Sequence, residues 1–287
     1  MKKVLSLFLI MGCLLTTGCI KRDSLEDIDI YTTIYPIEYI TNRLYGEHSN
    51  VFSIYPDGVE VKDYTLTDKQ IKDYSKSKMI IFNGLSNEKD YVISMYKHNN
   101  NIKIIDTTLS MEYTHSYEEL WLDPLNFLMM TQNIRTGFRQ YINNHYLKNE
   151  IDENYEELKI EISNLDAKIK LMVENASDKT IVVSSDLFKF LEKYNLNVIS
   201  LEENETLNDK TKAEVASLIK NKKISYIFLK QGEVANDTIL TLTKDTNIEF
   251  IYLHTLDNLT EEERSTDKDY ISIMNENIEL LKQEVYN

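Results

Sequence analysis

"IDENYEELKIEISNLDAKIKLMVE", residues 151–174, separates two similar halves of this chain. Apolar side chains recur in it in alternating steps of four and three residues, at Ile151, Tyr155, Leu158, Ile162, Leu165, Ile169 and Met172. This spacing predicts one apolar face on a helix of about seven turns. A face of that length favours a rigid connector that packs against the structure on either side of it, and we expect this helix over residues 149–178.

Eight short runs rich in β-branched and aromatic residues flank this region, four before it and four after it. They are DIYTTIY (29–35), VFSIYP (51–56), MIIFNG (79–84), IKIIDT (102–107), TIVVSS (180–185), LNVISL (196–201), SYIFLK (225–230) and EFIYLH (249–254). Nearly continuous apolar runs are typical of parallel strands that helices bury on both faces. The sequence therefore predicts an α/β fold of two lobes, each a mostly parallel four-stranded sheet with flanking helices, over residues 27–148 and 179–287.

The N-terminal residues predict an exported lipoprotein. "MKK" followed by "VLSLFLIMGCLL" has the charged and apolar regions of a secretory signal peptide, which we expect over residues 1–18. "TTGC" then predicts cleavage before Cys19, so that Cys19 is lipidated and residues 19–26 form a tether on the extracytoplasmic face of the cell membrane. Thr16 stands where such sites usually carry Leu, and Cys13 is a competing site.

Charge and cysteine content exclude several classes of protein. Lys and Arg total 32 against 47 Asp and Glu, so the formal net charge is −15. Such a chain is a poor nucleic-acid binder, because phosphate binding depends on basic residues that displace counterions. The two cysteines, Cys13 and Cys19, lie in or beside the signal peptide. The exported part of the chain is therefore expected to have no disulfide and no cysteine-ligated metal.

The two lobes predict a binding site in the cleft between them. In open parallel sheets a ligand lies beyond the carboxyl ends of the strands, so two facing lobes share one cleft. The loops at those ends are 57–64, 118–123, 184–186 and 230–233. An exported protein of this form is expected to be a solute receptor. The sequence has no G-x-x-x-x-G-K-[ST] loop, so we do not expect the chain itself to use ATP. We expect no enzyme, because these loops have no nucleophile with a base and no paired acid and base. Asp123 before Pro124 predicts a helix cap.

Several stretches together resemble one family. They are YTTIYPIEYITNRLYG (31–46), YPDGVEVKDYTLT (55–67), IFNGL (81–85), LWLDPLN (120–126), FKFLEKYNL (188–196) and LTEEERSTDKDYISIMNENIELL (259–281). In this order they resemble the zinc and manganese substrate-binding lipoproteins of bacterial ABC importers. The resemblance implies two lobes around a backbone helix and a monomeric receptor. It also implies a permease and its ATPase as partners, zinc or manganese as the transported ligand, and no other cofactor.

At the positions where this family carries metal ligands, the chain has different residues. Lys62 stands in place of a His in the loop after the second strand, and Glu119 in place of a second His two residues before the Trp. Ser185 stands where the family has His or Glu, and Lys230 where it has an acidic residue. Glu119 is the one family ligand position that keeps a metal-ligating side chain, and of the family's His-rich loop only His115 remains.

These replacements argue against tight zinc or manganese binding. Zinc takes about four N, S or O ligands, and a protonated lysine is no ligand because its ordinary pKa is about 10.4. The five histidines do not pair with one another at helical or hairpin spacing; they are His48, His98, His115, His145 and His254. A hard-cation site built from carboxylates of the same loops stays open as an alternative, with Glu60, Asp63, Asp186 and Glu233 as its candidates.

Two hypotheses of function stay open. In the first, the chain is a solute receptor, and the residues at the four replaced positions bind a small charged solute, zwitterionic or anionic. In the second, it is a surface adhesin or interaction module that has lost its ligand, and Lys62 pairs with Glu119 in the vacated metal site. We expect the Lys62 ammonium within salt-bridge distance of the Glu119 carboxylate. An open polar cavity favours the first hypothesis, and a closed cleft with this ion pair favours the second.

Overall fold

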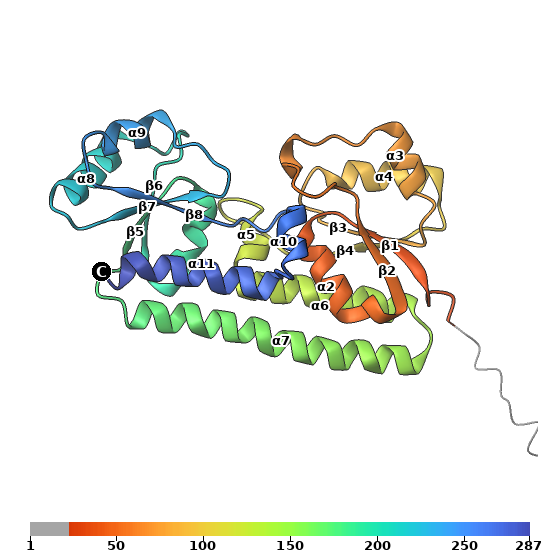
Figure 1. Ribbon diagram of the computed structural model, residues 1–287. Helices are drawn as coiled ribbons and strands as arrows, with labels where there is room; N and C mark the ends of the chain where they lie inside the picture. Colours follow the sequence, from red (N-terminus) through yellow and green to blue (C-terminus); the bar gives the residue numbers. More distant parts are fainter. Residues whose placement is uncertain (1–22) are drawn as a thin grey trace, which may run out of the picture.

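The computed structural model describes residues 23–287, so the predicted signal peptide (1–18) and the predicted lipidation site Cys19 lie outside the described residues. Figure 1 shows two α/β lobes that stand side by side above one long helix, α7 (His145–Glu174). Each lobe is built on a four-stranded parallel sheet. The predicted fold class is therefore confirmed. Within residues 23–287, no helix has the length and apolar character that a membrane crossing requires.

The N-terminal lobe has the strand order β2-β1-β3-β4. Its strands are β1 (Ile28–Thr32), β2 (Ser49–Ser53), β3 (Met79–Phe82) and β4 (Lys103–Asp106). Its helices are α2 (Tyr35–Tyr45), α3 (Asp68–Tyr74), α4 (Glu88–His98), α5 (Glu119–Leu122) and α6 (Pro124–Tyr141), with the short helices η1 (Gly46–His48) and η2 (Val61–Asp63). The connections from β1 to β2 and from β3 to β4 are right-handed and run toward opposite edges of the sheet. They therefore place α2 and α4 on opposite faces of the sheet. Helices α2 and α6 lie on the face toward α7 (Figure 1).

The C-terminal lobe repeats this topology with the order β6-β5-β7-β8. Its strands are β5 (Thr180–Val183), β6 (Asn197–Ser200), β7 (Tyr226–Lys230) and β8 (Glu249–Leu253). Its helices are η3 (Asp186–Tyr194), α8 (Asp209–Lys220), α9 (Asp237–Thr243), α10 (Glu261–Ser265) and α11 (Tyr270–Val285). All eight strands overlap the apolar runs that predicted them. Strand β3 in the middle of its sheet is fully buried, whereas the edge strands β2 and β4 keep exposed positions.

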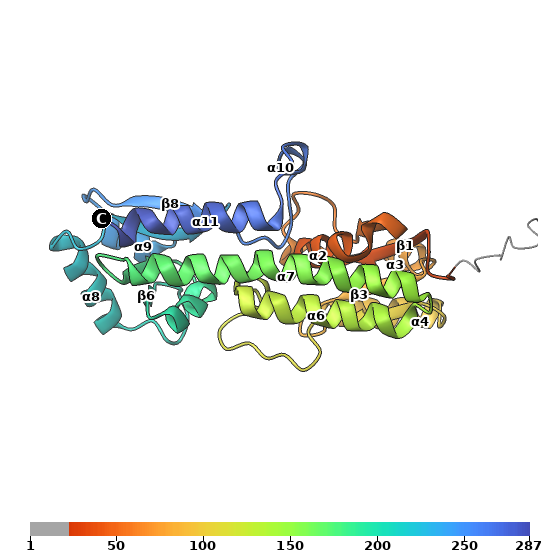
Figure 2. The same cartoon turned by 90° about the horizontal axis from the view of Figure 1, so that it is seen from below.

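Helix α7 joins the lobes. It begins six residues before Ile151 because the side chain of Asn144 accepts a hydrogen bond from the Tyr146 amide at 2.9 Å and caps the helix there. All seven residues of the predicted apolar face are buried. Helices α2 and α6 of one lobe and α11 of the other pack on α7, and Figure 2 shows α7 running beside α6 and α11 along the molecule. The helix runs over residues 145–174, where the sequence predicted 149–178.

A second connection between the lobes is the segment 254–269, which we call the crossing segment. It leaves β8, contacts the N-terminal lobe and then enters α11. The Gly58 amide donates to the Leu259 carbonyl at 2.8 Å, and the Tyr35 amide donates to the Asp257 carbonyl at 3.0 Å. The lobes are therefore joined by α7 below and by backbone hydrogen bonds close to the cleft.

One local feature differs from the sequence-based expectation, and a second agrees with it. Residues 23–26, which we expected in the tether, pack on the N-terminal lobe: the Asp23 carboxylate accepts from the Asn144 amide at 2.8 Å, and the Tyr45 hydroxyl donates to the Leu25 carbonyl at 2.8 Å. The helix cap predicted at Asp123 is confirmed, because its carboxylate accepts from the Leu125 amide at 2.9 Å.

Candidate functional site

A cavity of about 420 Å³ lies between the two lobes. Residues of both lobes and of the crossing segment line it, and they are Ile34, Glu60, Val61, Lys62, Tyr117, Glu118, Trp121, Lys230, Gln231, Gly232, Glu233, Val234, Thr255 and Asp257. Three of the four loops that the sequence predicted to face the cleft contribute to this lining. The cleft therefore lies beyond the carboxyl ends of the strands, as in other open parallel sheets.

The loop 57–64 reaches the cavity through a turn at Gly58. Gly58 has a φ of +73°, a conformation that residues with a Cβ rarely adopt, and its amide is hydrogen-bonded to the crossing segment. The loop continues into η2, which carries Lys62 to the rim of the cavity. The Lys62 ammonium lies 3.9 Å from the Glu60 carboxylate, and the two side chains are 61% and 64% exposed. This pair is weak, because water screens it.

Glu119 does not face this cavity. Its side chain is buried, and its carboxylate accepts hydrogen bonds from the backbone amides of Thr114 and His115. It therefore holds the preceding loop against the start of α5. The predicted ion pair between Lys62 and Glu119 is wrong, because Glu119 is turned into the loop while Lys62 stays at the exposed rim with Glu60.

Glu118 takes the place in the cavity that the sequence predicted for Glu119. Successive helical residues point about 100° apart, so the two adjacent carboxylates face different surroundings. The Ser116 hydroxyl donates to Glu118. Burial raises the pKa of the Glu118 carboxyl above its ordinary value, and the nearby Lys230 ammonium offsets part of that rise while Asp257 adds to it. Glu118 is thus a carboxyl group that a cation in the cavity would stabilise in its ionised form.

The Ser185 hydroxyl takes part in hydrogen bonds within the C-terminal lobe. Its hydroxyl donates to the Glu202 carboxylate at 2.8 Å and accepts from the Leu187 amide at 3.4 Å, which caps η3. Among the described residues that line the cavity, neither Ser185 nor Glu119 is present. The neighbouring Ser184 instead donates to the cavity residue Glu233 at 2.5 Å.

Lys230 does line the cavity, as the sequence analysis expected of a site residue. It ends β7, and the following turn has Gly232 at a φ of +77°. The Glu233 carboxylate accepts from the Lys230 backbone amide at 2.9 Å, which closes the turn and fixes Glu233 at the cavity wall. Within residues 23–287, the Lys230 ammonium has no carboxylate within 4.0 Å.

The sequence analysis did not single out Asp257. This residue belongs to the crossing segment, and its carboxylate accepts from the Thr255 hydroxyl at 2.7 Å. The indole N–H of Trp121 donates to the Thr255 carbonyl at 2.7 Å, which fixes this wall of the cavity to α5. Asp257 could have been found by the rule applied to the other loops, because it follows the carboxyl end of β8.

The side chains of residues 23–287 do not come together as a metal site. Over residues 23–287, no three His, Cys, Asp or Glu side chains come together in a way that could hold a metal ion. Of the carboxylates considered for a hard cation, Glu60 and Glu233 line the cavity, whereas Asp186 pairs with Lys189 at 3.0 Å. His254 lies in the crossing segment and contacts Glu263 at 3.2 Å, outside the lining of this cavity.

Comparison with known proteins places the chain. A family model described as "Zinc-uptake complex component A periplasmic" matches residues 30–284. The chain belongs to this family. The match spans both lobes, α7 and the crossing segment, so the predicted resemblance to metal receptors of ABC importers is confirmed.

Relatives in the family are distant in sequence. The zinc-binding lipoprotein AdcA of Streptococcus pneumoniae (strain ATCC BAA-255 / R6) is 23% identical over 310 residues, which cover 99% of this chain and 61% of AdcA. The chain therefore spans less than two thirds of that relative. A metal ABC transporter substrate-binding lipoprotein of Lactococcus lactis is 23% identical over 303 residues, which cover 97% of this chain and 96% of that lipoprotein.

The fold agrees with solved structures of the family. The Zn(II)-bound ZnuA-like domain of Streptococcus pneumoniae AdcA superposes with a TM-score of 0.75 at 22% identity, over 91% of this chain and all of that domain. A likeness at this identity shows the shared two-lobed fold. What the cleft of this chain binds has to be argued from its own side chains.

Proposed function

We propose that this chain is the extracytoplasmic solute receptor of an ABC importer, and that its cleft takes a small charged solute in place of a tightly bound zinc or manganese ion. Family membership supports the receptor role. The observation that carries the altered ligand is the cavity itself: two lysines, Lys62 and Lys230, stand in it at positions where the resemblance implies metal ligands. A protonated lysine has no lone pair with which to ligate a metal, so these two positions supply no metal ligand.

The alternative, an adhesin or interaction module without a ligand, is less well supported. It required a closed cleft with Lys62 paired to Glu119. The cleft instead holds an open cavity of about 420 Å³ with charged groups from both lobes, a volume in the range of small-molecule sites. These features favour solute binding.

The proposal includes attachment and partners. Cys19 is the proposed site of lipidation, with residues 19–22 and the signal peptide outside the part of the chain that the structure describes. A lipid anchor there would hold a monomeric receptor near a permease and its ATPase. The described residues begin in the N-terminal lobe, so the proposed anchor would join the receptor at that lobe (Figure 1).

Elemental analysis of the purified chain, together with mass spectrometry of the small molecules that denaturation releases, tests this function. We expect well under one equivalent of zinc or manganese per chain and a released organic solute. Added zinc should leave the thermal unfolding midpoint nearly unchanged, because a ligand stabilises a protein only through affinity for the folded state. One tightly held zinc per chain, with a large saturable shift at micromolar zinc, would restore the chain to the metal receptors.

A further inference from the structure

The cavity carries an excess of negative charge. Its lining has two ammonium groups and four carboxylates, namely Lys62, Lys230, Glu60, Glu118, Glu233 and Asp257. Lys62 and Glu60 lie together at the exposed rim and offset each other. The remaining part of the lining then has three carboxylates against one ammonium. A solute that balances these charges has to carry net positive charge, because burying unpaired charge is costly.

These carboxylates do not converge on one point. A metal ion needs its oxygen ligands within about 2.0–2.6 Å of a single position, and among residues 23–287 no such group of three acidic or histidine side chains exists. The carboxylates come from three different parts of the chain: Glu118 from the start of α5, Glu233 from the turn after β7 and Asp257 from the crossing segment. Carboxylates at separate places in one cavity suit a solute whose cationic groups are separated by several atoms.

Apolar side chains also belong to the lining of the cavity. They are Ile34, Val61, Tyr117, Trp121 and Val234. Methylene groups gain free energy when such surface covers them. The half-buried ring of Tyr117 adds an aromatic face on which an ammonium group is also stabilised. The lining therefore offers ionic partners from several parts of the chain together with apolar contact.

We infer that the solute of this cleft is a small organic cation with two amino groups, of the diamine or basic amino acid class. This inference rests on the proposed function, since it names the solute of that receptor. The ammonium groups of the solute contact Glu118, Glu233 or Asp257, and its methylene groups contact the apolar lining. A carboxylate, where the solute has one, contacts Lys230. A purely anionic solute, one of the expectations from sequence, would face three carboxylates and is disfavoured.

Calorimetric titration of the purified full chain, freed of bound small molecules, tests the inference. The probes are 1,4-diaminobutane, 1,5-diaminopentane and lysine, with butylamine, glutamate, inorganic phosphate and zinc chloride for comparison. We expect the diamines or lysine to bind at least about tenfold more tightly than butylamine, because a second charge-assisted hydrogen bond adds to affinity. Tighter binding of lysine than of the diamines assigns the basic amino acid class, and its loss in Lys230→Met assigns the carboxylate partner.

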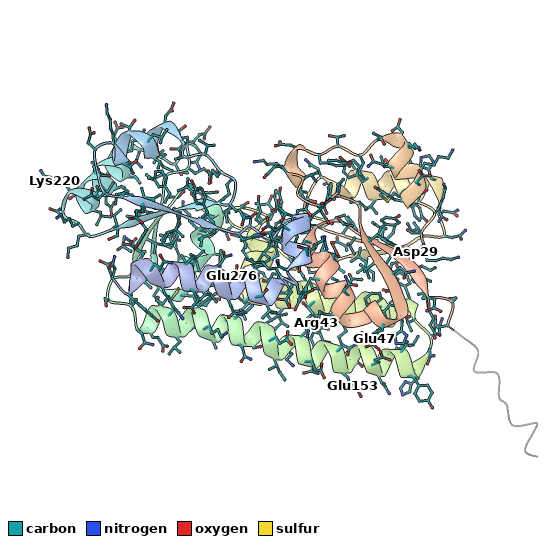
Figure 3. All side chains as sticks on the ribbon, in the orientation of Figure 1. Asp29, Arg43, Glu47, Glu153, Lys220 and Glu276 are labelled. Carbon is teal, nitrogen blue, oxygen red and sulfur yellow. The ribbon has the colours of Figure 1, made fainter. Side chains whose placement is uncertain are left out.

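Conservative variants separate the site from the fold. Glu118→Gln and Asp257→Asn should each weaken diamine binding by about tenfold or more, since each removes one ionic partner without removing the side chain. Glu153→Gln is the matched control, because Glu153 is exposed on α7, far from the lobes' loops (Figure 3). Its binding should equal that of the unaltered chain. Equal weakening in all three variants would overturn the inference, because the effect would then be one of total charge.

The other outcomes are distinguishable. Binding of glutamate or phosphate in preference to the amines, with dependence on Lys230, would overturn the diamine class and leave the solute-receptor function standing. One zinc bound per chain in competition with the amines would overturn both the diamine class and the altered ligand. No binding by any of the probes, with no solute released on denaturation, would overturn the receptor function as well.

Discussion

Arg264 donates hydrogen bonds from its two terminal guanidinium nitrogens to the two carboxylate oxygens of Glu38, at 2.7 and 2.9 Å. Its Nε also donates to the Asp57 carboxylate at 2.7 Å. Arg264 belongs to the crossing segment, Glu38 to α2 and Asp57 to the loop that carries Lys62. One guanidinium group therefore fastens the crossing segment to the N-terminal lobe beside the cleft.

The pair of Arg264 and Glu38 should be energetically coupled. Their side chains are 29% and 11% exposed, so removal of either partner leaves a poorly solvated charge. We expect Arg264→Met to lower the free energy of unfolding by about 1–3 kcal/mol, and the double variant with Glu38→Gln to cost less than the sum of the single changes. Denaturant unfolding of the four proteins measures this. The exposed pair Lys76 and Asp73 is the control and should show no coupling.

Glu88 should make stability depend on pH. It is 5% exposed and accepts from the Asn83 amide at 3.1 Å, and burial raises the pKa of its carboxyl to about 7. The folded state thus binds a proton that the unfolded state releases at a lower pH. This contribution to stability is complete below about pH 4.5 and is lost as pH rises to about 7, a change on the order of 3 kcal/mol.

Glu88→Gln should remove most of that dependence. The free energy of unfolding, measured in denaturant from pH 5 to pH 8, should fall with pH in the unaltered chain and stay flatter in the variant. At pH 8 the variant should be the more stable of the two, because it buries no charge. The same slope in both proteins would show that Glu88 stays ionised in the fold, and Glu153→Gln should keep the original slope.

Tyr270 should be a stabilising contact between the lobes. It is fully buried, its ring stacks on Phe127 with 3.7 Å between centroids, and its hydroxyl donates to the Trp121 carbonyl. Tyr270→Phe keeps the ring and removes the donor, so we expect a loss of about 1–2 kcal/mol in the free energy of unfolding. Tyr286→Phe is the control at a tyrosine that is 44% exposed, and it should change nothing. Equal small effects at both positions would contradict the prediction.

Binding of a diamine in the cleft should weaken as the pH is lowered. Burial raises the pKa of the Glu118 carboxyl, Asp257 and Glu202 raise it further, and Lys230 lowers it. Glu118 therefore gains a proton at a higher pH than an ordinary glutamate, and a protonated carboxyl no longer pairs with an ammonium. Titrations at pH 5 and pH 8 should show weaker binding at pH 5. In Glu118→Gln the difference between the two should shrink, and an unchanged difference would assign it to another group.

Lipid attachment should depend on Cys19. Metabolic labelling with a fatty acid should mark the unaltered chain and the Cys13→Ala variant, and should fail in Cys19→Ala. The variant without Cys19 should also be released from the membrane or be misprocessed, because a single lipidated cysteine is the proposed anchor. The reverse pattern would assign the anchor to Cys13.

Local sequence patterns were sufficient for the fold. The eight apolar runs are short and rich in β-branched and aromatic residues, which favours strands, and the apolar face from Ile151 to Met172 is buried along its whole length. The helix cap at Asp123 was also predictable, since Asp is a favoured cap and the following Pro fits the first helical position. Both ends of α7 were misjudged by about four residues, and at its start the Asn144 cap begins the helix earlier than predicted.

The site was harder to predict because it depends on where single side chains turn. Glu118 and Glu119 are adjacent carboxylates, and the amides of a nearby loop decide which one turns away from the cavity. Ser185 looked available, yet its hydroxyl caps η3. Asp257 reaches the cleft only because the crossing segment passes over the N-terminal lobe, a contact between residues far apart in the sequence.

The crossing segment and α11 follow all eight strands in the chain, so they emerge after both sheets when the chain emerges from its N-terminus. Until they emerge, the face of α7 that α11 covers stays open to water, and the Trp121 indole lacks the Thr255 carbonyl to which it donates. Both sheets can form before that moment, whereas the joint between the lobes cannot. An emerging chain of this protein thus carries an uncovered apolar seam until residues 254–285 have followed, and an exposed seam of this kind favours association with neighbouring chains.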